Sequence, residues 1–269
     1  NTTNRFYEGW VNQIDIQPLL GTDDLNGGGE VISLLDSTII DAIADYALLP
    51  VSAPVRPAYL SKSLTLFLTL TNVRGVPFSL NGNAPGSAEE EMAYYADRMQ
   101  FETVQGSGAT KSPCAIPLPL GASGDGWGLL KDAAKATGAF PIFLAPRVIN
   151  RKANDYLTSP WQSMACGDPE TVLPHWPLKA GDPFKTLNVD GGMTDNDPFQ
   201  LSHDFLAVQN PMATRDRMTC ELHNPPDGDT ANCAVLTVAP FPANDTYNNE
   251  FDFAGNSSVL GMLPNLSAC

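Results

Sequence analysis

The chain has 269 residues, of which 43% are apolar and 17% charged, so it can bury a hydrophobic core as one large domain or two small ones. Its formal net charge of −15 argues against binding nucleic acid or an anionic membrane through bulk charge. No apolar run is long enough to cross a bilayer, and the first residues lack the basic and then apolar order of a signal peptide.

Residues 36–49 give the clearest helical pattern in the chain. Apolar side chains recur from Ile40 to Leu48 at the spacing of one helix face, whereas Asp41 and Asp45 are expected to face away from it. Pro50 ends the pattern, as a proline does one or two residues after a helix.

The middle of the chain predicts one strand and two further helices. Residues 64–71 alternate leucine with threonine or phenylalanine, which is typical of a strand. Residues 89–101 are expected to be helical, and residues 127–137 predict a short helix that ends at Gly138. The Gly-, Ser- and Pro-rich residues 105–126 are expected to form a long loop.

Towards the C-terminus, regular patterns become rarer. Residues 150–183 show little periodicity and are expected to be irregular, whereas residues 234–239 predict a last short strand. The alternation of strands and helices favours a layered α/β fold.

The most informative stretch lies between residues 186 and 199. Residues 186–189 alternate as a strand does, and the chain then breaks at Gly191–Gly192, where the backbone can approach another group closely. Asp197 is a good N-cap and Pro198 suits the first turn of a following helix. Asp190 is therefore expected at the end of a strand, where ligands bind in open α/β sheets. From the residues alone, a plain turn aspartate before a glycine pair is the preferred interpretation.

Three segments of the chain resemble the patatin-like phospholipase family, and the resemblance covers most of the chain. They are LFLTLTNVRGVP (66–77), TGAFP with APR (137–141 and 145–147), and the Asp-Gly-Gly motif (190–192) with Asn196 and Pro198 behind it. The order of the three segments makes the resemblance more specific than the Asp-Gly-Gly triplet would be alone.

The resemblance implies a three-layer α/β/α sandwich with a mostly parallel sheet. It implies a single domain over residues 1–269 that lacks its N-terminal nucleophile strand. Whether this domain is also truncated at the C-terminus stays open. Its activity would be hydrolysis of a lipid acyl ester by a serine–aspartate dyad without a cofactor, a metal or a nucleic-acid partner. Asp190 would be the catalytic base, supported by a loop and two pocket residues. These residues are Gly191, Gly192, Asn196 and Pro198 in the loop, and Arg74 and Arg147 in the pocket.

The sequence departs from the family pattern at the nucleophile. No G-x-S-x-G occurs in the chain, and the nearest candidate, GASGD (121–125), has aspartate at the last glycine position. We therefore expect the chain to start downstream of the nucleophile serine and of the glycine-rich oxyanion loop. The alternative is a non-catalytic lipid-binding or interaction protein with a degenerate patatin-like fold.

Other residues that could bind metals give weak signals. The five cysteines show no C-x-x-C pair, so we expect mostly buried thiols. Cys220, His223 and Cys233 lack a fourth zinc ligand, and the acidic turns at 195–197 and 227–229 do not keep the spacing of a calcium loop. The sequence leaves the oligomeric state and the location open, with the cytoplasm favoured.

Overall fold

The computed structural model describes residues 5–13, 15–25, 30–50, 61, 63–81, 89–112, 114–157, 173–209, 214–215, 222–223 and 234–238. The chain divides into two compact units, Asn1–Pro198 with Arg215–Glu221, and Phe199–Thr214 with Leu222–Cys269. The main sheet belongs to the first unit. Within the described ranges, no helix has both the length and the apolar character needed to cross a membrane.

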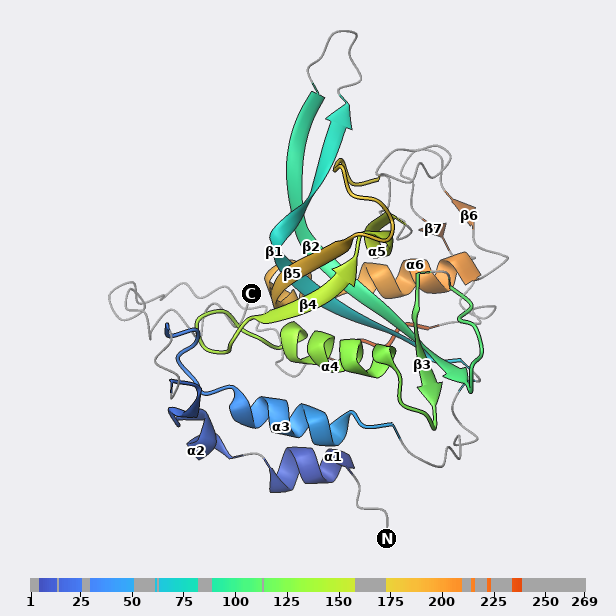
Figure 1. Ribbon diagram of the computed structural model, residues 1–269. Coiled ribbons are helices and arrows are strands. Elements are labelled where there is room, and N and C mark those ends of the chain that lie inside the picture. The colour runs from blue at the N-terminus through green and yellow to red at the C-terminus, as the bar shows by residue number, and fades with distance from the viewer. Residues whose placement is uncertain are drawn as a thin grey trace, which may run out of the picture. The chain divides into compact units, whose positions relative to one another are not determined.

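A five-stranded sheet forms the centre of the first unit (Figure 1). Its strands are β1 (Thr65–Asn81), β2 (Glu89–Gln105), β3 (Ile116–Leu120), β4 (Arg147–Lys152) and β5 (Pro183–Asp190). The strand order across the sheet is β3-β2-β1-β5-β4.

The chain therefore has a mixed α/β architecture, but the expectation of a mostly parallel sheet is wrong. Three of the four strand pairings are antiparallel, and only β2 and β3 run parallel. Between β1 and β2 the reason is the short connection, which returns the chain antiparallel to its neighbour, whereas parallel neighbours need a crossover.

The expectation of a helix over residues 89–101 is also wrong, because this segment is most of β2. Its side chains alternate, with Met99 and Phe101 buried on one face and Arg98 and Gln100 on the other. The strand pairs with β1 over nearly its full length, and the register shifts between Thr71 and Val76. This non-local pairing outweighs local helix propensity.

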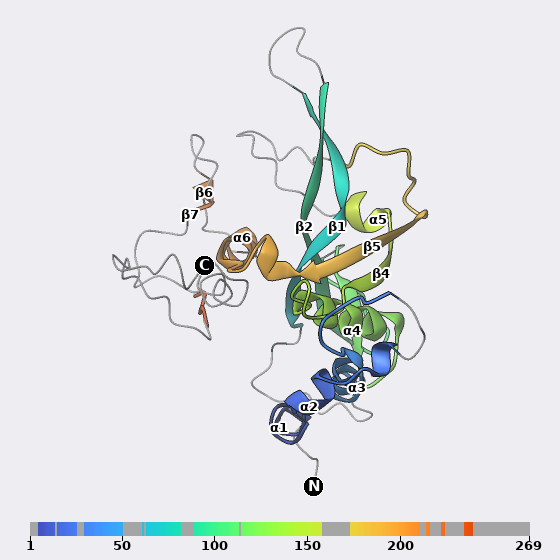
Figure 2. The same ribbon diagram turned by 90° about the vertical axis from the view of Figure 1, so that its left-hand side faces the viewer.

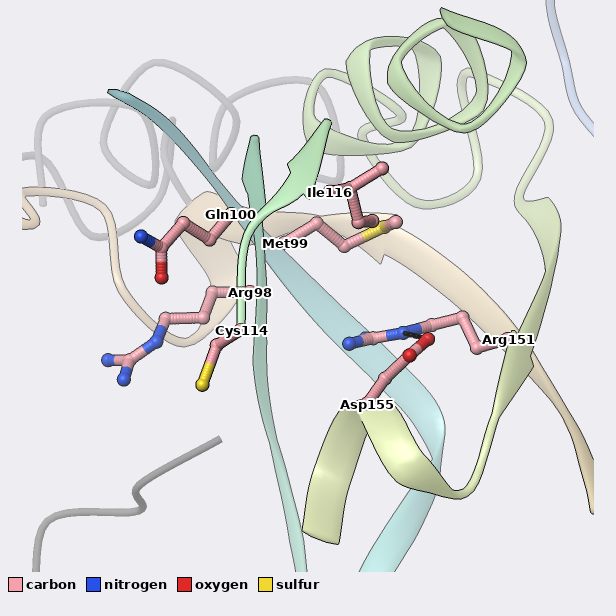
Figure 3. A pocket seen from close by; sticks show the side chains of 7 residues that line it. All are labelled: Arg98, Met99, Gln100, Cys114, Ile116, Arg151 and Asp155. Atoms are coloured by element: carbon pink, nitrogen blue, oxygen red, sulfur yellow. Dashed lines mark hydrogen bonds and ion pairs between the residues drawn. The ribbon is translucent and has the colours of Figure 1, made fainter. Parts of the chain in front are cut away.

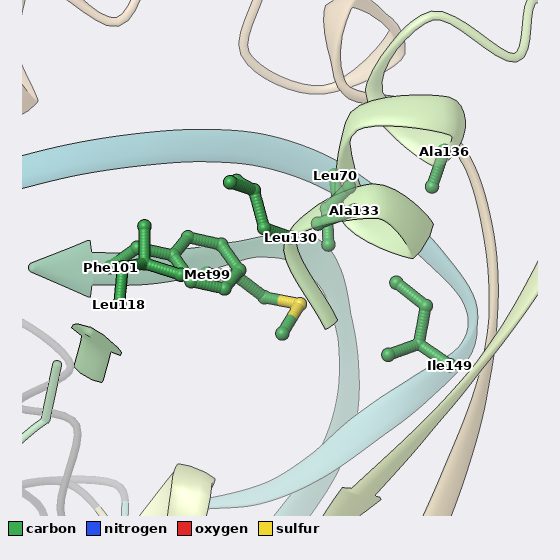
Figure 4. Close-up of a cluster of buried hydrophobic side chains, with 8 residues drawn as sticks. All are labelled: Leu70, Met99, Phe101, Leu118, Leu130, Ala133, Ala136 and Ile149. Atoms are coloured by element: carbon green, nitrogen blue, oxygen red, sulfur yellow. The ribbon is translucent and has the colours of Figure 1, made fainter. Parts of the chain in front are cut away.

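The main core lies between the sheet and α4 (Asp125–Thr137). Figure 4 shows the side chains of the helix meeting those of four strands. The cluster consists of Leu70, Met99, Phe101, Leu118, Leu130, Ala133, Ala136 and Ile149. The helix predicted over 127–137 is confirmed, with Gly138 as its C-cap, and its alanines allow close approach to the sheet.

A second apolar cluster continues along the same face of the sheet. Val76, Phe78 and Phe184 pack there with Tyr156 of α5 (Asn154–Leu157), and Trp176 closes the cluster. Residues 150–183 are therefore more regular than expected, since they include the end of β4, α5 and the start of β5.

The N-terminal helices pack outside α4. They are α1 (Arg5–Tyr7), the π-helix η1 (Glu8–Asn12), α2 (Ile16–Leu19), the 3₁₀ helix η2 (Asp23–Leu25) and α3 (Thr38–Ala47). Figure 2 shows α3 on the side of α4 that faces away from the sheet. The helix predicted over 36–49 is confirmed as α3.

The sheet face opposite α4 remains partly open in the described part of the first unit. Val148 is 55% exposed and Leu187 is 39% exposed on this face, whereas their neighbours Ile149 and Thr186 are buried. Helices α3, α4 and α5 lie on one side of the sheet, so a third layer is not seen among these elements.

In the second unit, α6 (Phe199–Gln209) corresponds to the helix expected after Pro198. Two short strands, β6 (Thr214–Arg215) and β7 (Leu222–His223), pair with each other. Residues 234–238 form no strand in the described structure, against expectation, and residue 239 lies outside the described residues.

Candidate functional site

Asp190 is the last residue of β5 and begins the 3₁₀ helix η3 (Gly191–Met193), as its position before a glycine pair predicts. The residue is half-buried. Its Oδ1 accepts a hydrogen bond of 2.8 Å from the backbone N–H of Gly192. Among the described residues, no donor bonds to Oδ2, so this oxygen is available to accept a proton from another group.

The three segments that resemble the patatin-like family meet at Asp190. The backbone N–H of Asp190 donates to the carbonyl oxygen of Ala139, just after α4, at 3.0 Å. The hydroxyl of Thr71 on β1 donates to the carbonyl oxygen of Asp190 at 2.7 Å. The hydroxyl of Thr137 in turn bonds the carbonyl oxygen of Thr69 at 2.7 Å, which ties the end of α4 to β1. The main chain at Asp190 is therefore held from both sides.

The backbone of β1 approaches Gly191 closely, as the sequence predicts, although the φ of Gly191 is not positive. A Cβ atom at this position would lie 2.2 Å from the carbonyl oxygen of Thr69, a separation that packed atoms do not reach. Only a glycine allows β1 to pass this close behind the carboxylate of Asp190.

The loop after Gly192 folds back over the site. The side-chain oxygen of Asn196 lies 2.9 Å from the position that a Cβ of Gly192 would occupy. The hydroxyl of Thr194 lies 3.0 Å from that of Thr71, and the N–H of Asp195 donates to the carbonyl oxygen of Gly191 at 2.9 Å. Asn196 thus lies against the Asp190 loop, whereas Pro198 follows it as the last residue before the second unit.

Asp195 is a second acidic group beside Asp190. Burial raises the pKa of Asp195, the neighbouring carboxylate of Asp197 adds to this effect, and Arg98 partly offsets it. Burial lowers the pKa of Arg98, and the neighbouring carboxylates of Asp97 and Asp195 oppose this effect. The site therefore combines carboxylates with different environments, which is typical of functional sites and also of structural networks.

The two arginines expected to line a pocket point to other partners. Arg74 donates to the carbonyl oxygen of Lys185 at 2.8 Å and lies over the ring of Phe184 at 4.2 Å. Arg147 forms an ion pair of 2.9 Å with Asp41 of α3. Among the described residues, the hydrogen bonds of both side chains go to these partners and not to Asp190.

A row of buried amides lies two residues behind Asp190. Asn72 and Asn188 are opposite each other on β1 and β5 and are both fully buried. The side chain of Asn188 donates to Thr186 Oγ1 at 2.8 Å and to the carbonyl oxygen of Arg147 at 3.3 Å. Sequence reasoning missed this row, although two asparagines inside strand patterns are a signal, since asparagine is depleted in strands.

The nearest approach to a nucleophile motif is remote from Asp190. Ser123 is exposed in the turn between β3 and α4, and Gly121 takes a φ of +80° there. The end of α4 that bonds to Asp190 is the other one, and 13 helical residues span about 20 Å. Ser123 therefore does not form a dyad with Asp190 in this fold.

Sequence reasoning also missed a buried ion pair between the two apolar clusters. Arg151 donates to both carboxylate oxygens of Asp97 at 2.9 Å, and the hydroxyl of Tyr156 donates to Asp97 at 2.6 Å. The side chains of Arg151 and Asp97 are each 5% exposed. Burial opposes the charge of Arg151, but Asp97 and Tyr156 outweigh it and raise the pKa of Arg151.

A small cavity of about 30 Å³ lies beside this ion pair, at the edge of β2 next to the start of β3. Figure 3 shows Arg98 and Gln100 on one side of β2 and Arg151 with Asp155 on the other. This volume holds about one water molecule, and no lining residue belongs to β5 or to the Asp190 loop. The cavity is thus not lined by Asp190 or its loop, although Arg98 lines it and also interacts with Asp195.

Within the described ranges, no group of three His, Cys, Asp or Glu side chains is placed to hold a metal ion. His223 lies on β7, whereas Cys220 and Cys233, the other two candidate zinc ligands, fall outside the described residues. Cys114 is a half-buried thiol.

Comparisons with known proteins leave the family open. No protein-family model matches the chain, and no solved structure matches it. The chain is 31% identical over 270 residues to a protein of Sinorhizobium fredii named "Uncharacterized protein y4iI". The match covers 90% of this chain and 36% of that protein, so the chain spans about a third of the length of this relative.

Proposed function

We propose that the chain carries the aspartate half of a patatin-like serine–aspartate dyad and belongs to a hydrolase of lipid acyl esters. The observation that carries the proposal is the state of Asp190: its main chain is held by Thr71 and Ala139, Oδ1 is held by Gly192, and Oδ2 is left without a donor among the described residues. A general base needs such a fixed carboxylate with one oxygen open to the proton donor.

The sequence context supports the same proposal. The residues around Asp190 that hold it come from the three segments that resemble the family, although these segments are far apart in the chain. The antiparallel pairing of β5 with β1 differs from the mostly parallel sheet that the resemblance implies. The proposal therefore rests on the site and its motif, not on the topology of the sheet.

In the proposed reaction, a serine hydroxyl attacks the carbonyl carbon of the ester. Asp190 Oδ2 takes the hydroxyl proton while the serine Oγ–carbon bond forms, and then returns the proton to the leaving alcohol as the ester bond breaks. Water hydrolyses the acyl-serine by the same route. Since the chain contains no G-x-S-x-G and Ser123 lies at the other end of α4, we propose that the serine belongs to a part of the protein outside these 269 residues.

The test compares three aspartates in the full-length protein. Asp190→Asn keeps the size of the side chain and an oxygen for the N–H of Gly192, but it removes the base. We expect turnover to fall by about 10³-fold or more, since general bases contribute roughly 10²–10⁴-fold and this carboxylate has no histidine to assist it. The measurement is ester turnover beside a thermal melt.

Asp195→Asn and Asp197→Asn are the matched controls, because both remove a carboxylate from the same loop. We expect each to lose less than about tenfold, since neither bonds to the main-chain frame of β5 through its side chain in the described structure. A folded Asp190→Asn protein that keeps more than about a tenth of the activity would show that Asp190 is not the base. A folded wild-type protein without ester turnover would instead favour the non-catalytic, lipid-binding alternative.

A further inference from the structure

Large apolar side chains project into solvent from two segments beside the candidate site. Val31, Ile32 and Leu34 are 66%, 67% and 65% exposed, and Phe140 and Ile142 are 40% and 70% exposed. Single exposed apolar residues are ordinary on protein surfaces, but a contiguous group of them marks an interaction surface.

Hydrogen bonds hold the two segments together. The N–H of Leu34 donates to the carbonyl oxygen of Ile142 at 2.8 Å, and the N–H of Leu35 donates to that of Phe143 at 3.0 Å. The two segments therefore lie side by side, and we call their exposed apolar side chains the apolar rim (Val31, Ile32, Leu34, Phe140 and Ile142). Residues 34 and 35 thus follow the segment after α4.

The apolar rim is directly attached to the Asp190 site. Ala139, whose carbonyl oxygen accepts the N–H of Asp190, immediately precedes Phe140. Met193, in the 3₁₀ helix that follows Asp190, is also 56% exposed. The apolar rim is therefore joined to the Asp190 site through the main chain of Ala139.

The backbone at Ile142 is the least ordinary in this surface. Its φ is +75°, in the left-handed region that β-branched residues rarely adopt. Such a conformation is strained, and strained residues of this kind are concentrated at functional sites. In this conformation the side chain of Ile142 is 70% exposed and gains no core packing in return.

The charge around the rim limits what it can bind. Residues 30–36 and 138–146 contain no lysine or arginine and carry the acids Glu30 and Asp36, in a chain with a net charge of −15. Arg147 is engaged by Asp41. An apolar surface without basic residues can bind a lipid interface that carries no net charge, whereas an anionic lipid interface repels it.

We propose that the apolar rim inserts into a zwitterionic lipid surface, such as phosphatidylcholine, and delivers lipid to Asp190. The inference rests on the proposed function for what happens after docking, but binding itself needs only the rim.

The experiment uses the full-length protein and the double variant Leu34→Asn/Ile142→Asn. Asparagine tolerates the left-handed backbone better than isoleucine, so the substitution at Ile142 adds no strain. We expect affinity for phosphatidylcholine vesicles to fall by about tenfold for each large apolar side chain removed from lipid, roughly a hundredfold together. Turnover of an ester embedded in the vesicles should fall with it, whereas turnover of a soluble short-chain ester should stay within about twofold.

Val148→Asn is the matched control, because Val148 is 55% exposed on the opposite face of the sheet. It should leave vesicle binding unchanged, with a thermal melt to show that each variant is folded. Asp190→Asn should bind vesicles as the wild type does while losing turnover of both esters, which separates a failure of docking from a failure of the proposed chemistry.

Several outcomes would overturn the proposal. One is a wild-type protein that does not bind phosphatidylcholine vesicles, and another is a folded double variant that binds them as tightly as the wild type. A third is binding that appears only when anionic phosphatidylglycerol is added. A wild-type dimer that the double variant turns into a monomer, without any vesicle binding, would assign the rim to a second copy of the chain instead.

Discussion

At the scale of single residues, Gly191 determines how closely β1 can approach Asp190. Gly191→Ala would place a Cβ 2.2 Å from the carbonyl oxygen of Thr69, which is backbone and cannot turn aside. We expect the free energy of unfolding to fall by about 1–3 kcal/mol or more, since overpacking displaces the backbone. Urea denaturation measures the change.

Gly181→Ala is the control for this substitution. A Cβ at Gly181 meets no atom within 4 Å, and its backbone is not in the left-handed region. We expect it to be neutral or slightly stabilising, because alanine lowers the entropy of the unfolded chain. Equal stability of the two variants would mean that the contact between Gly191 and β1 is not as tight as the structure shows.

At the scale of secondary-structure elements, the ion pair between Arg151 on β4 and Asp97 on β2 holds the sheet between its two apolar clusters. Asp97→Ala would leave Arg151 buried without its main partner. Breaking such a pair from one side costs about 3–5 kcal/mol. Chemical denaturation should therefore show a large loss of stability.

Asp45→Ala tests the same kind of contact at the surface. Asp45 of α3 pairs with Lys131 of α4 at 2.9 Å, but its side chain is 70% exposed. Solvent screens an exposed pair, which therefore contributes little to stability, so this variant should remain close to the wild type. If the loss for Asp97→Ala were no larger than for Asp45→Ala, the buried pair would contribute no more to stability than an exposed one.

At the scale of the whole molecule, stability should fall in acid. Burial would raise the pKa of Glu102, but hydrogen bonds from Ser63, Ser112 and Lys111 outweigh it and lower this pKa. An acid whose folded pKa is depressed stabilises the fold above its unfolded pKa of about 4.3, and that stability is lost as pH falls through the folded pKa. We expect the free energy of unfolding to decrease steeply below about pH 4.

Glu102→Gln should lower stability at neutral pH and flatten this acid limb, because the group that takes up the proton is gone. Glu30→Gln, which removes an exposed carboxylate, is the comparison. Urea midpoints between pH 7 and pH 3 give both slopes. Parallel acid limbs for the wild type and Glu102→Gln would exclude Glu102 as a source of the acid sensitivity.

Local patterns in the sequence were enough for several elements and for the candidate site. The periodicity of α3 and α4, the alternation at the start of β1 and the strand before Gly191 all depend on neighbours a few residues apart, and each is confirmed. Asp190 lies at a strand end for the same reason.

Segments whose partners are distant in the chain could not be assigned in this way. Residues 89–101 are predicted to be a helix from their local pattern, but β1 pairs with them as a strand. Asp41 is expected to face solvent, but Lys135 of α4 and Arg147 of β4 form ion pairs with it. The buried pair of Asp97 and Arg151 is 54 residues apart in sequence and leaves no local signal.

Wherever one periodicity dominates, the residues alone were enough to predict the type of an element and its approximate place, because backbone conformation there follows from side chains within two turns. The ends were less well predicted, since β1 continues to Asn81, ten residues beyond the expected strand end at residue 71. Three features became apparent only in the folded chain: the mostly antiparallel sheet, the hydrogen bonds that hold Asp190 to β1 and to the end of α4, and the position of Ser123 at the far end of α4. The physical reason is that strand pairing and burial depend on contacts between distant residues, whose energies exceed local propensity but leave no periodic pattern in the chain.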